Sequence, residues 1–151
     1  VFGFGQDVQI CRYHQIYVMY HGTTVAAAIQ IIMNGFSQSK DGMLGRGVYV
    51  SRNQDKAARY PLGDQSDQVI LKLRVNVGKV KKIDRQYNLM QKTWHDHGYD
   101  TAWVPAYCGM VKSGLEEDCV WDPKRIKVVG IVQAPPGYLP QLQQLVARYK
   151  K

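Results

Sequence analysis

Apolar and polar residues alternate most regularly between residues 69 and 77. Every second residue from Val69 to Val77 is apolar, whereas Lys72 and Arg74 lie between them. A period of two is typical of a strand with one buried face, so a half-buried strand is predicted here. Short runs rich in β-branched and aromatic residues predict further strands over residues 16–20, 48–50, 79–83, 101–104, 118–121 and 127–132.

Apolar residues recur at helical spacing in two other segments. Residues 24–33 show this spacing, and Asn34-Gly35 after them is a typical helix end. A second helix is predicted from about Pro140, because proline is favoured in the first turn and the apolar residues that follow form one stripe. Two shorter helices are expected, one from a cap at Asn53 to the next proline and one over residues 85–92.

The order of these elements indicates the fold class. Strands outnumber helices and do not alternate with them in βαβ units, which favours an α+β domain built on antiparallel sheets. Because the chain contains no internal repeat, low-complexity tract or linker-like stretch, we expect a single domain over residues 1–151. Hydrophobic residues at 45% and charged residues at 21% exclude a disordered chain, and no apolar run approaches the roughly 20 residues that span a bilayer.

Charge and cysteine content narrow the possible partners and compartment. Twenty basic against twelve acidic residues give a net charge of +8, which favours polyanions such as nucleic acid or the diphosphate of a dinucleotide. Three cysteines without a CxxC pair, after a start that lacks the features of a signal peptide, predict reduced thiols and an intracellular, most simply cytoplasmic, location. His95-Asp96-His97 has no evident third ligand nearby, so we expect a polar surface turn and no metal.

Three separate clusters carry residues that suit chemistry. His21, followed by Gly22 and Thr23, comes at the end of a predicted strand, where a ring can face a cleft. A glycine-punctuated loop over residues 42–47 leads into Tyr49, whose ring can stack on a flat ligand. Glu117 opens a later strand beside apolar residues, where a carboxylate can accept hydrogen bonds from a sugar. Taken alone, the His21 and Glu117 clusters are explained more simply by structural roles, and the cluster before Tyr49 also fits an ordinary glycine turn.

Taken in order, the three clusters resemble the H-Y-E signature of the PARP-like ADP-ribosyltransferases. The resemblance comprises His21 with Gly22 and Thr23, Tyr49 with Tyr60 eleven residues beyond it, and Glu117 before Val-Trp-Asp-Pro. It extends over roughly residues 17–132. Within this superfamily the sequence is most similar to the virus- and interferon-induced PARP-like proteins of fish, which implies a role in antiviral innate immunity.

The resemblance implies a fold, a co-substrate and a role for each residue. The fold would be split antiparallel sheets with flanking short helices, and NAD+ would lie in the cleft between them without a metal. His21 would bind an NAD+ ribose, the Gly22 backbone would pair with the nicotinamide amide, and Thr23 would lie near the adenine-side ribose. Tyr49 and Tyr60 would enclose the nicotinamide ring. Glu117 would bind and polarise the nicotinamide ribose, so that His21, Tyr49 and Glu117 form the catalytic set.

One departure from the family pattern leaves alternatives open. Many relatives have a serine three residues before the second tyrosine, but this chain has Ala57, which removes one hydrogen bond to the nicotinamide amide. The resemblance favours transfer of a single ADP-ribose to a protein or nucleic-acid acceptor. The first alternative is a module that binds NAD+ or ADP-ribose without turnover. The second is an RNA 2′-phosphotransferase, against which Glu117 counts.

Overall fold

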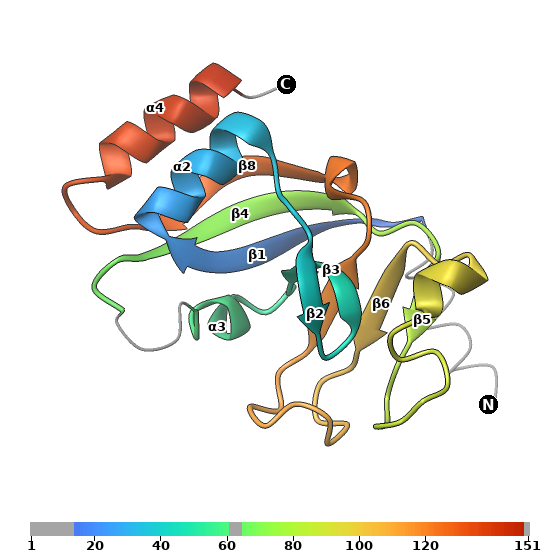
Figure 1. Cartoon of the computed structure of the whole chain (residues 1–151). Coiled ribbons are helices and arrows are strands. Elements are labelled where there is room, and N and C mark those ends of the chain that lie inside the picture. Colours follow the sequence, from blue (N-terminus) through green and yellow to red (C-terminus); the bar gives the residue numbers. More distant parts are fainter. Residues whose placement is uncertain (1–13, 61–64, 150–151) are drawn as a thin grey trace.

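Two β-sheets and three α-helices make up the structure, a computed structural model that describes residues 14–60 and 65–149 (Figure 1). The elements follow one another as β1 (Ile16–Thr24), α2 (Val25–Asn34), β2 (Ser39–Gly42), β3 (Gly45–Val50), α3 (Gln54–Ala57), β4 (Gln68–Asn76), β5 (Val80–Lys82), the 3₁₀ helix η1 (Trp94–His97), β6 (Thr101–Val104), β7 (Glu117–Val120), the 3₁₀ helix η2 (Pro123–Arg125), β8 (Ile126–Gln133) and α4 (Leu139–Tyr149).

The first sheet is antiparallel, with the strand order β1-β4-β8. Helices α2 and α4 lie side by side over one of its faces (Figure 1). The alternating apolar residues of β4, among them Leu71, Leu73 and Val75, are fully buried and belong to the same core as residues of these helices. Thr24 caps α2 by accepting a hydrogen bond from the Ala27 amide. The period-two pattern of β4 thus places this strand at the centre of the main core.

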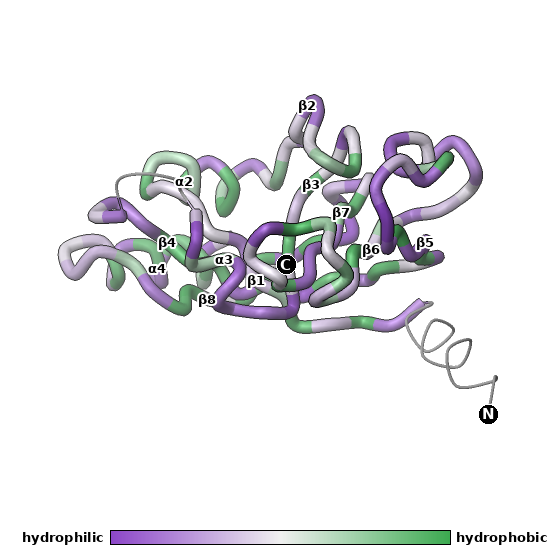
Figure 2. The backbone as a smooth tube through the Cα atoms, turned by 90° about the horizontal axis from the view of Figure 1, so that it is seen from below, coloured by the Kyte–Doolittle hydropathy of each residue, from purple (hydrophilic) through white to green (hydrophobic). Residues whose placement is uncertain are grey.

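The second sheet has the strand order β2-β3-β7-β6-β5 and a smaller core of its own. Trp94 is the largest buried side chain in this core, and its indole nitrogen donates a 2.7 Å hydrogen bond to the Leu44 carbonyl. This bond satisfies the polar atom of a buried tryptophan, as the packing of that residue requires. Figure 2 shows that β2, the strand at one edge of this sheet, is largely hydrophilic.

The two sheets meet at a pair of backbone hydrogen bonds between β1 and the residue after β3. The Tyr20 amide donates to the Ser51 carbonyl at 2.7 Å, and the Ser51 amide donates to the Tyr20 carbonyl at 3.1 Å. This bridge brings the middle of β1 beside the end of β3. It therefore sets how the predicted His21 and Tyr49 regions lie relative to each other.

Most strand predictions are confirmed, with ends shifted by a few residues. The segments 16–20, 101–104 and 127–132 all form strands, and the helix over 24–33 is confirmed as α2. The strand predicted over 118–121 begins one residue earlier, at Glu117. The α+β class with two largely antiparallel sheets and flanking short helices also agrees with the structure, except that β5 and β6 pair in parallel.

Two local predictions are wrong, and a third, the helix with a cap at Asn53, is confirmed only in its cap and first turn. The segment 85–92 forms successive turns and no helix, because its polar side chains bond to the backbone: the Asn88 side chain accepts from the Met90 amide. The segment 42–47, predicted as a loop, belongs to the β2–β3 hairpin. The helix capped by Asn53 is a single turn, since the carbonyls of Ala58 and Tyr60 accept bonds from a side chain outside it.

The position of β4 leads to a test of the main core. Replacing Leu73 with alanine is expected to lower the free energy of unfolding by about 2–5 kcal/mol, because the fully buried side chain leaves a cavity. Urea denaturation measures the change. The matched control is Leu89→Ala, at a residue that is 96% exposed, which is expected to change stability by less than about 0.5 kcal/mol. Equal losses in both variants would contradict this assignment of the core.

Candidate active site

A cavity of about 560 Å³ opens where the end of β1 meets the second sheet. This volume lies in the range of about 300–1,000 Å³ that is usual for small-molecule sites. Residues of β1, β2, β3, α3, β7 and the loop before β7 line it. The cavity wall comprises Tyr20, His21, Gly22, Ser39, Asp41, Gly42, Met43, Tyr49, Val50, Ser51, Lys56, Ala57, Tyr60, Met110, Val111, Lys112 and Glu117.

The ring of His21 is fixed on one side by the backbone of β3. Its Nδ1 lies 2.8 Å from the Tyr49 carbonyl oxygen, which can only accept a hydrogen bond, so Nδ1 carries the proton. The ring of Phe36 packs edge-on against the imidazole at 5.0 Å. Burial lowers the pKa of His21, with the bond to Tyr49 acting in the opposite direction. The neutral ring therefore has Nε2 as a free acceptor.

The hydroxyl of Tyr49 is used within the β2–β3 hairpin, which leaves the ring to line the cavity. The hydroxyl donates to the Gly45 carbonyl at 2.6 Å and accepts from the Leu44 amide at 2.9 Å. Burial raises the pKa of Tyr49, so the phenol stays protonated. The ring also crosses Gly42 closely, since a Cβ at that residue would lie 2.4 Å from the Tyr49 hydroxyl.

Glu117 is the first residue of β7, and its side chain is almost completely buried at the cavity. The Nζ atom of Lys56, which is buried as well, lies 3.9 Å from Glu117 Oε1. Burial raises the pKa of Glu117, and the positive charge of Lys56 partly offsets this effect. The cavity thus contains one carboxyl group whose ionisation depends on one lysine.

Tyr60 is held at the cavity by contacts of the segment that follows α3. The side-chain nitrogen Nε2 of Gln68 donates hydrogen bonds to the backbone carbonyls of Ala58 and Tyr60, at 2.6 and 2.7 Å. Gly22 allows this segment to approach β1, because a Cβ there would lie 1.9 Å from the Ala57 carbonyl oxygen. Tyr60 is still 38% exposed. Its pKa is raised mainly by partial burial and to a smaller extent by the negative charge of Glu117.

The structure brings together at this cavity nearly all the residues that the sequence pattern singles out. His21, Gly22, Tyr49, Tyr60 and Glu117 all line it, whereas Thr23 is not among the lining residues. Sequence reasoning missed Lys56 as a partner of Glu117. It also missed the loop over 110–112, because these residues match no motif that the sequence analysis used. Lys56 could have been recognised as a site residue, since it lies four residues before Tyr60 in the segment for which the sequence predicts a helix.

Comparison with known families provides independent information about this cavity. Residues 6–104 match the poly(ADP-ribose) polymerase catalytic domain family, which is more than half of the chain. The chain belongs to this family. The matched range includes His21, Tyr49 and Tyr60 and ends before Glu117. Members of the family use NAD+ as co-substrate. Comparison with curated proteins gives no match.

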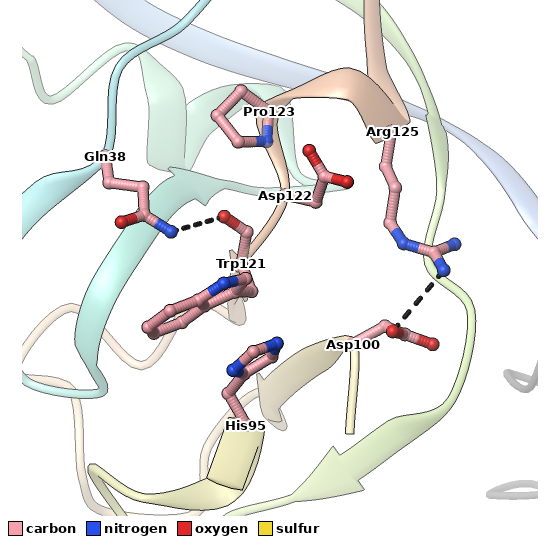
Figure 3. Close-up of a pocket in the computed structure, with 7 residues that line it drawn as sticks. All are labelled: Gln38, His95, Asp100, Trp121, Asp122, Pro123 and Arg125. Atoms are coloured by element: carbon pink, nitrogen blue, oxygen red, sulfur yellow. Dashed lines mark hydrogen bonds and ion pairs between the residues drawn. The ribbon is translucent and has the colours of Figure 1, made fainter. Parts of the chain in front are cut away.

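A second hollow, of about 340 Å³, shares no lining residue with the first cavity. Figure 3 shows the side chains that line this second hollow. The ring of His95 stacks on that of Trp121, with centroids 3.9 Å apart and planes inclined by 5°. Arg125 pairs with Asp100 across the hollow at 3.3 Å.

The two histidines of His95-Asp96-His97 have different partners. The His97 ring bonds to the Thr93 carbonyl, whereas the His95 ring stacks on Trp121. Within residues 14–60 and 65–149, no three His, Cys, Asp or Glu side chains form a group suited to a metal ion.

No helix in the described part of the chain has the length and hydropathy needed to cross a membrane.

The Lys56–Glu117 pair leads to a test by titration. Replacing Lys56 with methionine is expected to raise the pKa of Glu117 further, because it removes the nearby positive charge. The folded protein then keeps the Glu117 proton at pH values at which the unfolded chain has already released it. The free energy of unfolding therefore falls as the pH rises from the unfolded pKa to the folded pKa, and this range is wider in Lys56→Met than in the wild type. Carboxyl ¹³C NMR measures the pKa. The exposed control Lys40→Met is expected to leave it unchanged, and a lower pKa in Lys56→Met contradicts the pairing.

Proposed function

We propose that this protein transfers ADP-ribose from NAD+ to an acceptor and releases nicotinamide. The observation that carries the proposal is the convergence of His21, Tyr49 and Glu117 on one cavity, although they lie far apart in the sequence. Membership of the poly(ADP-ribose) polymerase catalytic domain family supports ADP-ribosyltransferase chemistry at this cavity.

In this proposal, the donor end of NAD+ is held by a neutral histidine and two aromatic side chains. The free Nε2 of His21 accepts a hydrogen bond from a ribose hydroxyl, a role that its lowered pKa supports because imidazolium could not accept. The rings of Tyr49 and Tyr60 enclose the nicotinamide, a planar ring suited to aromatic stacking. The Gly22 backbone pairs with the carboxamide. Thr23 contacts the adenine-side ribose from the end of β1.

The reaction breaks the glycosidic bond between ribose C1′ and the pyridinium nitrogen. The bonding electron pair moves to that nitrogen, so nicotinamide leaves as a neutral molecule and the sugar acquires oxocarbenium character, as in glycoside cleavage. Glu117 accepts a hydrogen bond from the ribose and stabilises the developing positive charge, and Lys56 favours its ionised form. The acceptor nucleophile then bonds to C1′ and loses its proton. Because the leaving group is activated by its own positive charge, the step requires no metal.

We further propose that one ADP-ribose is transferred to a protein or nucleic-acid acceptor, in an antiviral role in the cytoplasm. The resemblance to virus- and interferon-induced PARP-like proteins of fish supports the antiviral role, and three cysteines without a CxxC pair support the compartment. The short segment from Ser37 to Leu44, which includes β2, supports single transfer over chain elongation. The excess of basic over acidic residues suits the diphosphate of NAD+ and an anionic acceptor alike.

A second candidate is a module that binds NAD+ or ADP-ribose without turnover. Ala57 favours this candidate, because it lines the cavity where many relatives provide a serine hydroxyl. The lost bond is worth about 0.5–1.5 kcal/mol of binding. The presence of Glu117 in the same cavity favours the enzyme, and it also counts against an RNA 2′-phosphotransferase.

Labelled NAD+ tests the catalytic role of Glu117. Wild-type protein is expected to release nicotinamide, and Glu117→Gln is expected to lower the rate by about 10²–10³-fold, because the amide cannot stabilise the positive sugar. Chromatography of released nicotinamide gives the rate, and circular dichroism checks the fold. Asp96→Asn, at an exposed acid on η1, is the matched control and is expected to keep the wild-type rate. Binding of NAD+ by the wild type without nicotinamide release would establish the non-catalytic module instead.

The alanine at the cavity wall can be tested by restoring the hydroxyl. Ala57→Ser is expected to strengthen the binding of nicotinamide by about 2–10-fold, which corresponds to one added hydrogen bond. Isothermal titration calorimetry with nicotinamide measures the affinity. Ala58→Ser, at the next residue and outside the cavity wall, is expected to leave it unchanged. The same affinity in Ala57→Ser as in the wild type would contradict this placement of the carboxamide.

A further inference from the structure

The carboxylate of Glu116, the residue before Glu117, has shorter polar contacts than the carboxylate of Glu117. Glu116 accepts two parallel hydrogen bonds from Arg52, from Nε at 2.8 Å and from Nη2 at 2.7 Å. Its Oε1 also accepts a 2.8 Å bond from the Trp103 indole, and its backbone carbonyl accepts a 2.8 Å bond from the Ser51 hydroxyl. Bidentate pairing of arginine with a carboxylate fixes the orientation of both groups.

The guanidinium of Arg52 is itself held by both sheets. It lies 5.0 Å from the centre of the Tyr17 ring on β1 and 5.9 Å from that of Trp103 on β6. Cations over aromatic faces at such distances are attracted by the rings, more strongly when partly desolvated. The Glu116 side chain is only 13% exposed and that of Arg52 is 32% exposed. We call this cluster of Arg52, Glu116, Trp103 and Tyr17 the Glu116 clamp.

The clamp adjoins Glu117 in a way that determines where Glu117 points. Glu116 directly precedes Glu117, the first residue of β7, and successive Cα atoms lie about 3.8 Å apart. The side chain of Glu116 is held by Arg52 and Trp103 outside the cavity wall, whereas Glu117 lines the cavity. Oε1 of Glu117 lies 3.9 Å from Nζ of Lys56, a distance longer than that of a hydrogen bond. The direction of Glu117 is therefore set through the backbone, by its neighbour.

We propose that Arg52 is a positioning residue, which fixes Glu116 and thereby holds Glu117 in the reactive orientation at the cavity. This inference rests on the proposed function, since the orientation matters for cleavage of NAD+. Arg52 does not line the cavity, so it acts through Glu116 without touching the substrate. Lysine cannot replace it fully, because an ammonium cannot form two parallel bonds to one carboxylate.

Arg52→Met tests the proposal through two separate measurements. In steady-state kinetics of nicotinamide release, kcat is expected to fall by about 10²-fold, since a misplaced reacting group costs about this much. KM for NAD+ is expected to change by less than about threefold, because the donor-binding residues remain. In carboxyl ¹³C NMR, the raised pKa of Glu117 is expected to fall toward the ordinary glutamate range, as the freed side chain reaches water.

Two comparison variants separate positioning from general stability. Arg52→Lys is expected to recover part of the lost kcat but not all of it. Arg125→Met removes an ion pair of similar exposure, with Asp100 at the second hollow, and is expected to keep the wild-type kcat and Glu117 titration. An equal loss of kcat in Arg125→Met would overturn the proposal. So would an Arg52→Met protein with wild-type kcat and an unchanged pKa of Glu117.

The design distinguishes failure of this inference from failure of the proposed function. If wild-type protein releases no nicotinamide, the proposed reaction is wrong, and the pKa of Glu117 in Arg52→Met alone decides whether the clamp positions it. If Arg52→Met does not fold, Glu116→Gln takes its place, because glutamine keeps the size and the acceptor for Trp103 and loses the charge. The same fall in kcat and in the pKa of Glu117 supports the proposal, and wild-type values overturn it.

Discussion

The reciprocal backbone hydrogen bonds between Tyr20 and Ser51 are the contact on which the candidate site depends. They join two sheets that also share the main core, in which Val48, Val50 and Val120 of the second sheet pack with residues of β1, β4 and β8. His21 follows Tyr20 directly, and Tyr49 precedes Ser51 by two residues, so this bridge sets the distance between the two. Ser51 then extends the link to the next strand, since its hydroxyl bonds to the Glu116 carbonyl beside Glu117. Three segments far apart in the sequence thus meet at one point.

The spacing of apolar residues was enough to predict strands and helices that bury one face, such as β4 and α2. The alternation from Val69 to Val77 identified the central strand, because burial of one strand face imposes a period of two. The apolar spacing after Thr24 and the Asn34-Gly35 end identified α2 in the same way. The sequence also singled out five residues that line the cavity, but through resemblance to a family, since no spacing rule places residues 21, 49, 60 and 117 side by side.

Contacts between distant residues explain what local pattern missed. The helix expected over residues 85–92 fails because Asn88 and Gln91 bond to nearby backbone groups instead of leaving them to a helix. Lys56 was missed because Glu117, on β7, is its neighbour in the folded structure and not in the sequence. The Glu116 clamp joins residues 17, 52, 103 and 116, and the acidic run over residues 116–118 gives no sign that its first member is paired with arginine.

The site combines a neutral histidine, two tyrosines and a buried carboxyl whose charge is opposed by burial and favoured by one lysine. Such an arrangement costs stability and suits the binding of a sugar that becomes positively charged. The most direct test is a crystal structure with a non-hydrolysable NAD+ analogue. The account predicts the pyridine-side ring between Tyr49 and Tyr60, with Glu117 in hydrogen-bond contact with the adjacent ribose. An analogue bound outside this cavity, or one whose ribose lies beyond the reach of Glu117, would contradict it.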